Sequence, residues 1–169
     1  MRTYSRTAVL AGVSAALVAP FALLAPAVAA PAQPAGEFGI QAISRAKVVE
    51  RAQTWVAAKV KYNAKGTRDG YRTDCSGYVS MAWWLGPGGQ KSTRTLPSVS
   101  TRIAKNSLAA GDILLGSGHT LIFHKWANAG KTQYWGYDMS TSNGAVHRAI
   151  PYPYWDGMQL APYRFKNIA

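Results

Sequence analysis

The spacing of apolar residues changes once along this chain, and the change limits the fold class that the chain can adopt. Between residues 44 and 85, apolar residues recur every three or four positions or run together, as expected for helices that bury a face. After Ala110-Gly111 the apolar segments are short and rich in β-branched and aromatic residues, which is typical of strands. Helices followed by antiparallel strands predict an α+β fold, with N-terminal helices packed on a small antiparallel sheet.

The same patterns predict individual elements. Residues 44–62 form the clearest helix, with Ser44 as its N-cap, and residues 75–85 form a buried helix that Gly86 ends. The polar stretch 63–72 is expected to be a loop, and 97–105 a short helix. Strands are expected at 112–115, 119–126, 133–139, 145–150 and 163–165.

The first 29 residues have the three parts of a secretory signal peptide. Arg2 and Arg6 give a positive start, residues 8–29 are almost wholly apolar, and Ala27-Val28-Ala29 is a cleavage site of small residues. We therefore expect 1–29 to be removed on export, which leaves no stable membrane anchor. Residues 30–39 read as a flexible lead-in, and 40–169 as a single domain of a protein that is secreted or held in the cell wall.

Charge and cysteine content narrow the functions that this domain can have. The chain has 19 Lys and Arg against 7 Asp and Glu, a formal charge of +12, which suits acidic partners outside the cell. Anionic wall polymers, lipid head groups and nucleic acid are all acidic, and charge alone does not choose between them. Nucleic acid is not expected, because the basic residues are dispersed and no nucleic-acid-binding motif is recognisable. One cysteine excludes an internal disulfide and a Cys-rich zinc site, and three histidines leave little for a metal cluster. Neither a metal nor an organic cofactor is expected.

The single cysteine, Cys75, is a candidate nucleophile. It lies between Asp74 and Ser76-Gly77, where a polar stretch meets an apolar helix. The free N–H groups and partial positive charge of a helix N-terminus favour a thiolate and bind an oxyanion. The alternative interpretation of Cys75 is a small buried apolar residue.

A nucleophilic thiolate requires a base, and His119 is the favoured one because it opens a strand after a Gly-Ser-Gly turn. His124 lies five residues later and should point to the opposite face, while His147 is expected on an edge strand in solvent. Asp138, near the end of the next strand, is the candidate that orients the imidazole. Its alternative role is a turn or cap residue before 140–144.

These residues resemble the NlpC-type (NlpC and p-sixty) cysteine peptidases. The resemblance is carried by Asp74-Cys75-Ser76-Gly77 before an apolar helix, by the run 108–114 with Gly111-Asp112, and by Gly118-His119 at the start of a strand. It implies a papain-like fold, with Cys75 as nucleophile, His119 as base and Asp138 as the third residue. The third position here is a carboxylate, where the family more often has His, Asn or Gln.

The resemblance also implies a substrate. Members of the family generally cut peptidoglycan stem peptides, often between D-γ-glutamate and a diamino acid, so we expect a monomeric peptidoglycan hydrolase. By position, Tyr62, Asp74 and Ser76 would hold the free amino end of the substrate, with Tyr71 competing for the role of Tyr62. The alternatives are an amidase or acyl transferase on the same scaffold, and a catalytically idle, basic wall-binding module.

Overall fold

The computed structural model describes residues 42–169, so the expected signal peptide (1–29) and lead-in (30–39) lie outside the described residues. This part of the chain is α+β, as predicted, with helices α1 (Arg45–Ala57) and α2 (Cys75–Ala82). Neither helix is long and apolar enough to cross a membrane. The strands are β1 (Asn63–Arg68), β2 (Tyr71–Thr73), β3 (Ser100–Arg102), β4 (Ile113–Leu115), β5 (Thr120–Trp126), β6 (Gln133–Ser140), β7 (Gly144–Pro151) and β8 (Ala161–Phe165).

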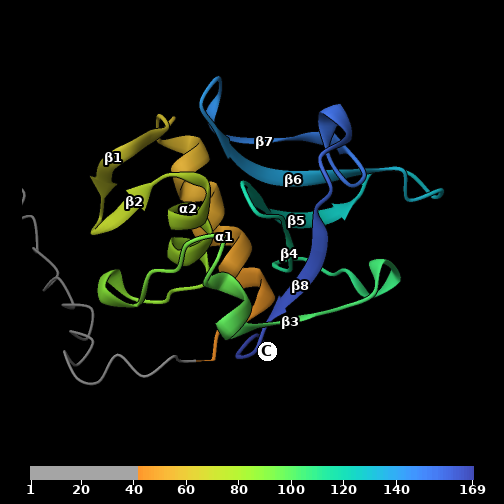
Figure 1. Cartoon of the computed structure of the whole chain (residues 1–169), viewed down its shortest axis with the longest axis horizontal. Coiled ribbons are helices and arrows are strands. Elements are labelled where there is room, and N and C mark those ends of the chain that lie inside the picture. The colour runs from red at the N-terminus through yellow and green to blue at the C-terminus, as the bar shows by residue number, and fades with distance from the viewer. Residues whose placement is uncertain (1–41) are drawn as a thin grey trace, which may run out of the picture. The chain divides into compact units, whose positions relative to one another are not determined.

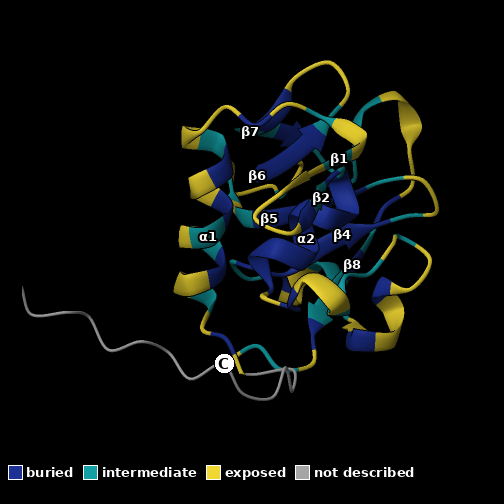
Figure 2. Cartoon of the chain, turned by 90° about the vertical axis from the view of Figure 1, so that its left-hand side faces the viewer, coloured by how far each residue is buried: buried dark blue, intermediate teal, exposed yellow. Residues whose placement is uncertain are grey.

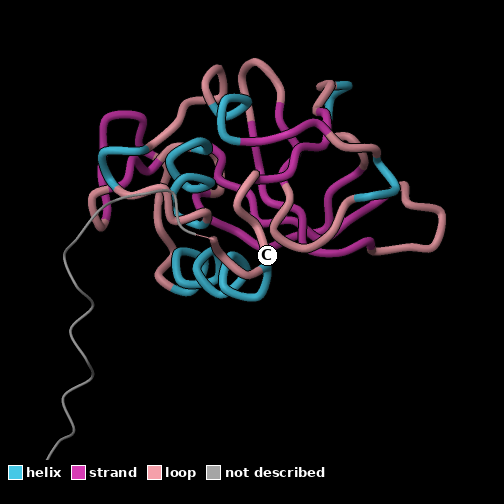
Figure 3. Tube along the Cα trace, turned by 90° about the horizontal axis from the view of Figure 1, so that it is seen from below, coloured by secondary structure: helices cyan, strands magenta, loops and turns pink. Residues whose placement is uncertain are grey.

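Six of these strands form one antiparallel sheet in the order β3-β8-β4-β5-β6-β7. The last strand, β8, lies between β3 and β4, so the C-terminal part of the chain is inside the sheet (Figure 1). The longest pairing is between β6 and β7, which are joined by a tight turn at residues 141–143. The two α-helices lie next to each other on one side of these strands, whereas the 3₁₀ turns are spread around them (Figure 3).

Helix α1 begins where its sequence predicts. The Ser44 side chain accepts a hydrogen bond from the Lys47 N–H at 3.2 Å, which satisfies one of the N–H groups left free at a helix start. Val48, Ala52 and Trp55 recur at helical spacing and are buried. Trp55 stacks on Tyr78 of α2 with ring centroids 5.4 Å apart, so this face of α1 holds α2 in place.

Helix α2 is buried along its whole length, whereas α1 has one buried and one exposed side (Figure 2). Its N-cap is Asp74, which accepts a 2.6 Å hydrogen bond from the Gly77 N–H. A Cβ at Gly77 would lie 2.0 Å from the carbonyl oxygen of Arg72, so only glycine lets the first turn of α2 approach β2 this closely. The Asp-Cys-Ser-Gly sequence therefore fixes where the helix starts.

The sheet is covered on both faces by separate apolar cores. Ile113, Ile122 and Tyr137 face the helices and pack with Trp55, Tyr78 and Trp83. The opposite face carries a second core, formed by Leu108, Leu114, Leu121, Phe123, Tyr134, Ile150 and Leu160. Residues 152–155 of the C-terminal segment pack against this second core. The aromatic residues of the C-terminal segment therefore cover the face of the sheet opposite α1 and α2.

Gly111-Asp112 joins the helices to the sheet. Gly111 has a φ of +85°, and its carbonyl accepts a hydrogen bond from Trp83 Nε1 at 2.9 Å. The Asp112 carboxylate is fully buried and is bound by Arg45 at 3.0 Å and by Arg164 at 2.8 Å. One buried carboxylate therefore ties the start of α1 to β8, and the role of this motif is structural.

Two expected elements are wrong. Residues 63–72, expected as a loop, contain the β1–β2 hairpin, in which Asp69 and Gly70 both have positive φ, as a type I′ turn requires. Residues 97–105, expected as one helix, contain most of a 3₁₀ turn (Leu96–Val99), then strand β3, and then the first residue of a second 3₁₀ turn (Lys105–Ser107). Both expected helices are also shorter at their C-terminal ends, at Ala57 and Ala82.

Candidate active site

Cys75 is the first residue of α2 and is 8 % exposed. The first N–H groups of a helix have no partner within the helix and carry partial positive charge. The sulfur of Cys75 therefore lies where a negative charge is stabilised. This is the position that the sequence predicts for a nucleophile, and the residue is also nearly buried, as its alternative interpretation requires.

His119 lies directly before β5 and bridges Cys75 and Asp138. Its Nε2 is 2.9 Å from Asp138 Oδ1 and, because an ionised carboxylate only accepts, Nε2 is the donor. Burial by itself lowers the pKa of His119, but hydrogen bonds to Asp138 and to Cys75 outweigh it and raise the pKa to about 9. The imidazole thus carries a proton at neutral pH, and the ring nitrogen not bound to Asp138 remains for the thiol.

Asp138 is fully buried in β6 and is not the turn residue of its alternative interpretation. Besides His119, its carboxylate accepts hydrogen bonds at Oδ2 from Arg148 Nη2 at 2.5 Å and from the Tyr154 hydroxyl at 3.0 Å. Burial favours the neutral acid, but the contacts with His119 and Arg148 outweigh it and hold the pKa of Asp138 below its ordinary value. The carboxylate is therefore ionised at neutral pH.

Sequence reasoning missed both Arg148 and Tyr154. Arg148 lies opposite Gly136, two positions along β7 from Val146, the residue that pairs with Asp138. Such diagonal neighbours on one face contact each other through long side chains, but they can be identified only when the register is known. Tyr154 lies in the C-terminal segment outside the strands, and no local pattern connects it to Asp138.

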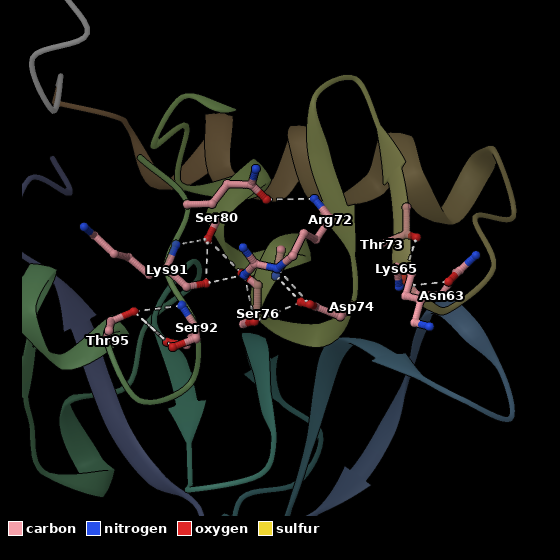
Figure 4. Close-up of polar contacts among 12 residues, drawn as sticks. Asn63, Lys65, Arg72, Thr73, Asp74, Ser76, Ser80, Lys91, Ser92 and Thr95 are labelled. Atoms are coloured by element: carbon pink, nitrogen blue, oxygen red, sulfur yellow. Dashed lines mark hydrogen bonds and ion pairs between the residues drawn. The ribbon is translucent and has the colours of Figure 1, made fainter. Parts of the chain in front are cut away.

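A polar network surrounds the N-terminus of α2 on the side of β2 (Figure 4). Arg72 Nε donates to Asp74 at 2.9 Å, and its Nη2 donates to the Ser76 hydroxyl at 3.3 Å and to the Lys91 carbonyl at 2.8 Å. Ser76 in turn donates to Asp74 at 2.8 Å. Burial raises the pKa of Asp74, but hydrogen bonds from Gly77, Arg72 and Ser76 outweigh it and lower the pKa. Asp74 and Ser76 lie beside Cys75, as expected, and Arg72 was not foreseen.

Tyr62 and Tyr71 are the two candidates for the position near Cys75, and of the two only Tyr62 interacts with Cys75. Burial, together with electrostatic interactions with Cys75 and Asp74, raises the pKa of Tyr62, so its phenol lies close enough to interact with both. Tyr71 is buried in the first core, and its hydroxyl accepts a hydrogen bond from the Gly86 N–H at 3.1 Å. Tyr71 therefore belongs to the scaffold.

The other two histidines pair with each other away from Cys75. His124 Nδ1 lies 3.0 Å from His147 Nε2, and the His147 ring stacks on Tyr137 at 4.4 Å. The His124 ring lies 5.7 Å from that of Tyr137, so His124 is on the face of the sheet that carries Tyr137, whereas Asp138, the partner of His119, is the next residue of β6 and points to the other face. His147 lies on edge strand β7, as expected, but it is half-buried, because its ring stacks on Tyr137 and Trp135.

No protein-family model matches the chain, and no curated protein matches its sequence. Over residues 42–169, no group of three His, Cys, Asp or Glu side chains is arranged to hold a metal ion. The side chains that could carry chemistry here are Cys75, His119 and Asp138, which form one chain of contacts.

Proposed function

We propose that this protein is a secreted cysteine peptidase of the NlpC type, with a papain-like fold, that hydrolyses peptidoglycan stem peptides. The observation that carries the proposal is one chain of contacts. A cysteine at a helix N-terminus contacts an imidazole, and the imidazole donates to a buried carboxylate. The same order of nucleophile, base and orienting group is used by hydrolases that form an acyl-enzyme.

The proposed reaction uses these groups twice. His119 holds the proton of Cys75 as an imidazolium, and the thiolate attacks the carbonyl carbon of the scissile amide. The N–H groups at the start of α2 stabilise the oxyanion. When the C–N bond breaks, His119 gives its proton to the leaving amine. It then takes a proton from water, whose oxygen attacks the acyl-enzyme and releases Cys75 as thiolate.

Mass spectrometry of purified stem peptides and of intact peptidoglycan tests this proposal. We expect new fragments cut after D-glutamate, absent with Cys75→Ala and with His119→Gln. His124→Gln is the matched control, because it removes an imidazole that does not contact Cys75 and should leave cleavage intact. Full hydrolysis by the Cys75→Ala protein would rule out the nucleophile. Wall binding that depends on salt and is indifferent to Cys75, without any cleavage, would instead indicate the binding-module alternative.

One observation favours an amidase acting on the same walls as a second candidate. Arg72 already donates to Asp74 and Ser76, two of the three groups that the resemblance assigns to a free amino end. A substrate whose peptide is still joined to the glycan has no such amino end and would not compete with Arg72. The product masses separate the two reactions, because an N-acetylmuramoyl-L-alanine amidase releases the intact stem peptide from the sugar.

A further inference from the structure

The buried carboxylate of Asp138 receives more donors than a simple orienting residue needs. His119 occupies Oδ1, whereas Arg148 and Tyr154 both donate to Oδ2. The two additional donors come from different parts of the chain, β7 and the C-terminal segment, and β5, β6 and β7 lie side by side (Figure 1). Their convergence on one atom of a fully buried group requires an explanation.

We propose that Arg148 and Tyr154 are positioning residues of the same site, which fix the Asp138 carboxylate against His119. The inference rests on the proposed function in so far as it takes Cys75 as the nucleophile. It adds the edge strand and the aromatic C-terminal segment to the catalytic centre.

The position of the Arg148 guanidinium favours the contact with Asp138 over complete hydrogen bonding of its own N–H groups. Its guanidinium lies over the ring of Trp155, with Cζ 4.2 Å from the centroid, and its Nη2 reaches Asp138. Its Nε is buried and has no hydrogen-bond partner among the described residues. A buried donor left unpaired is unfavourable, so the stacking on Trp155 and the ion pair with Asp138 together determine where the guanidinium lies.

Tyr154 contacts both members of the pair that it supports. Its hydroxyl donates to Asp138, and its ring is tilted against the His119 ring with centroids 4.9 Å apart. The neighbouring Trp155 packs edge-on against Tyr154 at 4.9 Å while it stacks on Arg148. Residues 154 and 155 thus restrict the imidazole, the carboxylate and the guanidinium together.

The charge of Arg148 sets how firmly the carboxylate holds the imidazolium. When His119 is neutral, Asp138 and Arg148 form a compensated pair. Without Arg148, a bare buried carboxylate would remain, and it would bind the proton of His119 more strongly. A firmly held proton is harder to give to a leaving amine. The titratable groups around the pair are Cys75 of α2, Arg148 of β7, Tyr154 of the C-terminal segment, and Tyr78 and Tyr134, which the charge of Asp138 influences.

The test follows the protonation of His119 by NMR and the alkylation of the single cysteine by iodoacetamide across pH. We expect Arg148→Gln to raise the pKa of His119 by about one unit, a tenfold change in the proton equilibrium. Arg148→Lys keeps the charge and should restore most of the original value. Tyr154→Phe removes a neutral donor and should shift the pKa in the same direction by less. Cysteine alkylation should show the same shifts in its pH profile.

Two matched controls separate positioning from general stability. Arg164→Lys alters an arginine that pairs with another buried carboxylate, Asp112, and Tyr152→Phe alters a tyrosine of the same C-terminal segment that has no hydrogen bond to Asp138. Both should leave the pKa of His119 and the alkylation profile unchanged. If Arg148→Gln fails to fold, Tyr154→Phe decides the question.

An unchanged His119 pKa in folded Arg148→Gln and Tyr154→Phe proteins would overturn the inference, even if activity fell. Neither readout requires a substrate, so the two proposals can fail separately. Absence of peptidoglycan cleavage by the unmodified protein, with the expected shifts present, would refute the substrate and leave the positioning roles standing. Cleavage by the unmodified protein, without the expected pKa shifts in the variants, would support the peptidase proposal and refute the positioning roles.

Discussion

Replacing Asp138 by Asn should remove the negative charge that keeps the His119 imidazole protonated beside the Cys75 thiol. The structure places the pKa of His119 at about 9, against an ordinary value of 6.5, and hydrogen bonding to Asp138 is the largest cause of the increase. This difference of about 2.5 units corresponds to about 3 kcal/mol favouring the protonated imidazole. Asn carries no charge, and burial lowers the pKa, so we expect the His119 pKa of Asp138→Asn to fall toward 6.5, with only the contacts of Cys75 left to raise it.

The measurement is an NMR titration of His119 together with the rate of hydrolysis. At pH 7.5 most of the His119 in the variant would be neutral, and we expect hydrolysis to fall by about 10²- to 10⁴-fold, the usual size of a general acid–base contribution. Arg148 would lose its partner in a buried place, so a loss of stability of about 3–5 kcal/mol is also expected and has to be followed by thermal unfolding.

Asp112→Asn is the matched control. Asp112 is also fully buried and paired with arginines, so the variant should lose a similar amount of stability. Its His119 should keep a pKa near 9, because Asp112 does not contribute to that value. A His119 pKa that stays near 9 in Asp138→Asn would refute the reasoning, since the carboxylate would then not be what stabilises the imidazolium.

Three further predictions concern the scaffold. Gly77→Ala should destabilise the protein by about 3 kcal/mol or more, because its Cβ would meet the Arg72 carbonyl, whereas Gly88→Ala, with nothing within 4 Å, should change the unfolding free energy by less than about 0.5 kcal/mol. Because the folded-state pKa of His119 is raised, its contribution to stability is complete below pH 6.5 and is lost as pH rises through 9. The urea-unfolding free energy should therefore fall by up to about 3 kcal/mol across that range, and His119→Gln should abolish the decline. Ser44→Ala should cost about 1 kcal/mol in thermal unfolding, because it removes the N-cap of α1.

Features that depend on neighbouring residues could be predicted from the sequence. The Ser44 cap, the buried spacing of α1 and the start of α2 at Cys75 are each set by a few consecutive residues, as are the strand segments after Gly111. The hairpin at residues 63–73 was missed although Asp69-Gly70 is a turn signal, because β1 is exposed almost throughout and has no alternating pattern.

The features of the candidate site also divide into those that the local sequence determines and those that depend on the tertiary structure. The surroundings of Cys75 and the position of His119 at the start of a strand are local, and Asp138 follows from its place on the next strand. The contacts of Asp138 with Arg148 and Tyr154, and of Asp74 with Arg72, depend on strand register and on how the C-terminal segment crosses the sheet. Sequence alone determined which residues are candidates for the chemistry. Only the tertiary structure decided which charged groups pair with them. A buried carboxylate has to be paired, and its partners are the groups that lie next to it in space, which can be far away in the sequence.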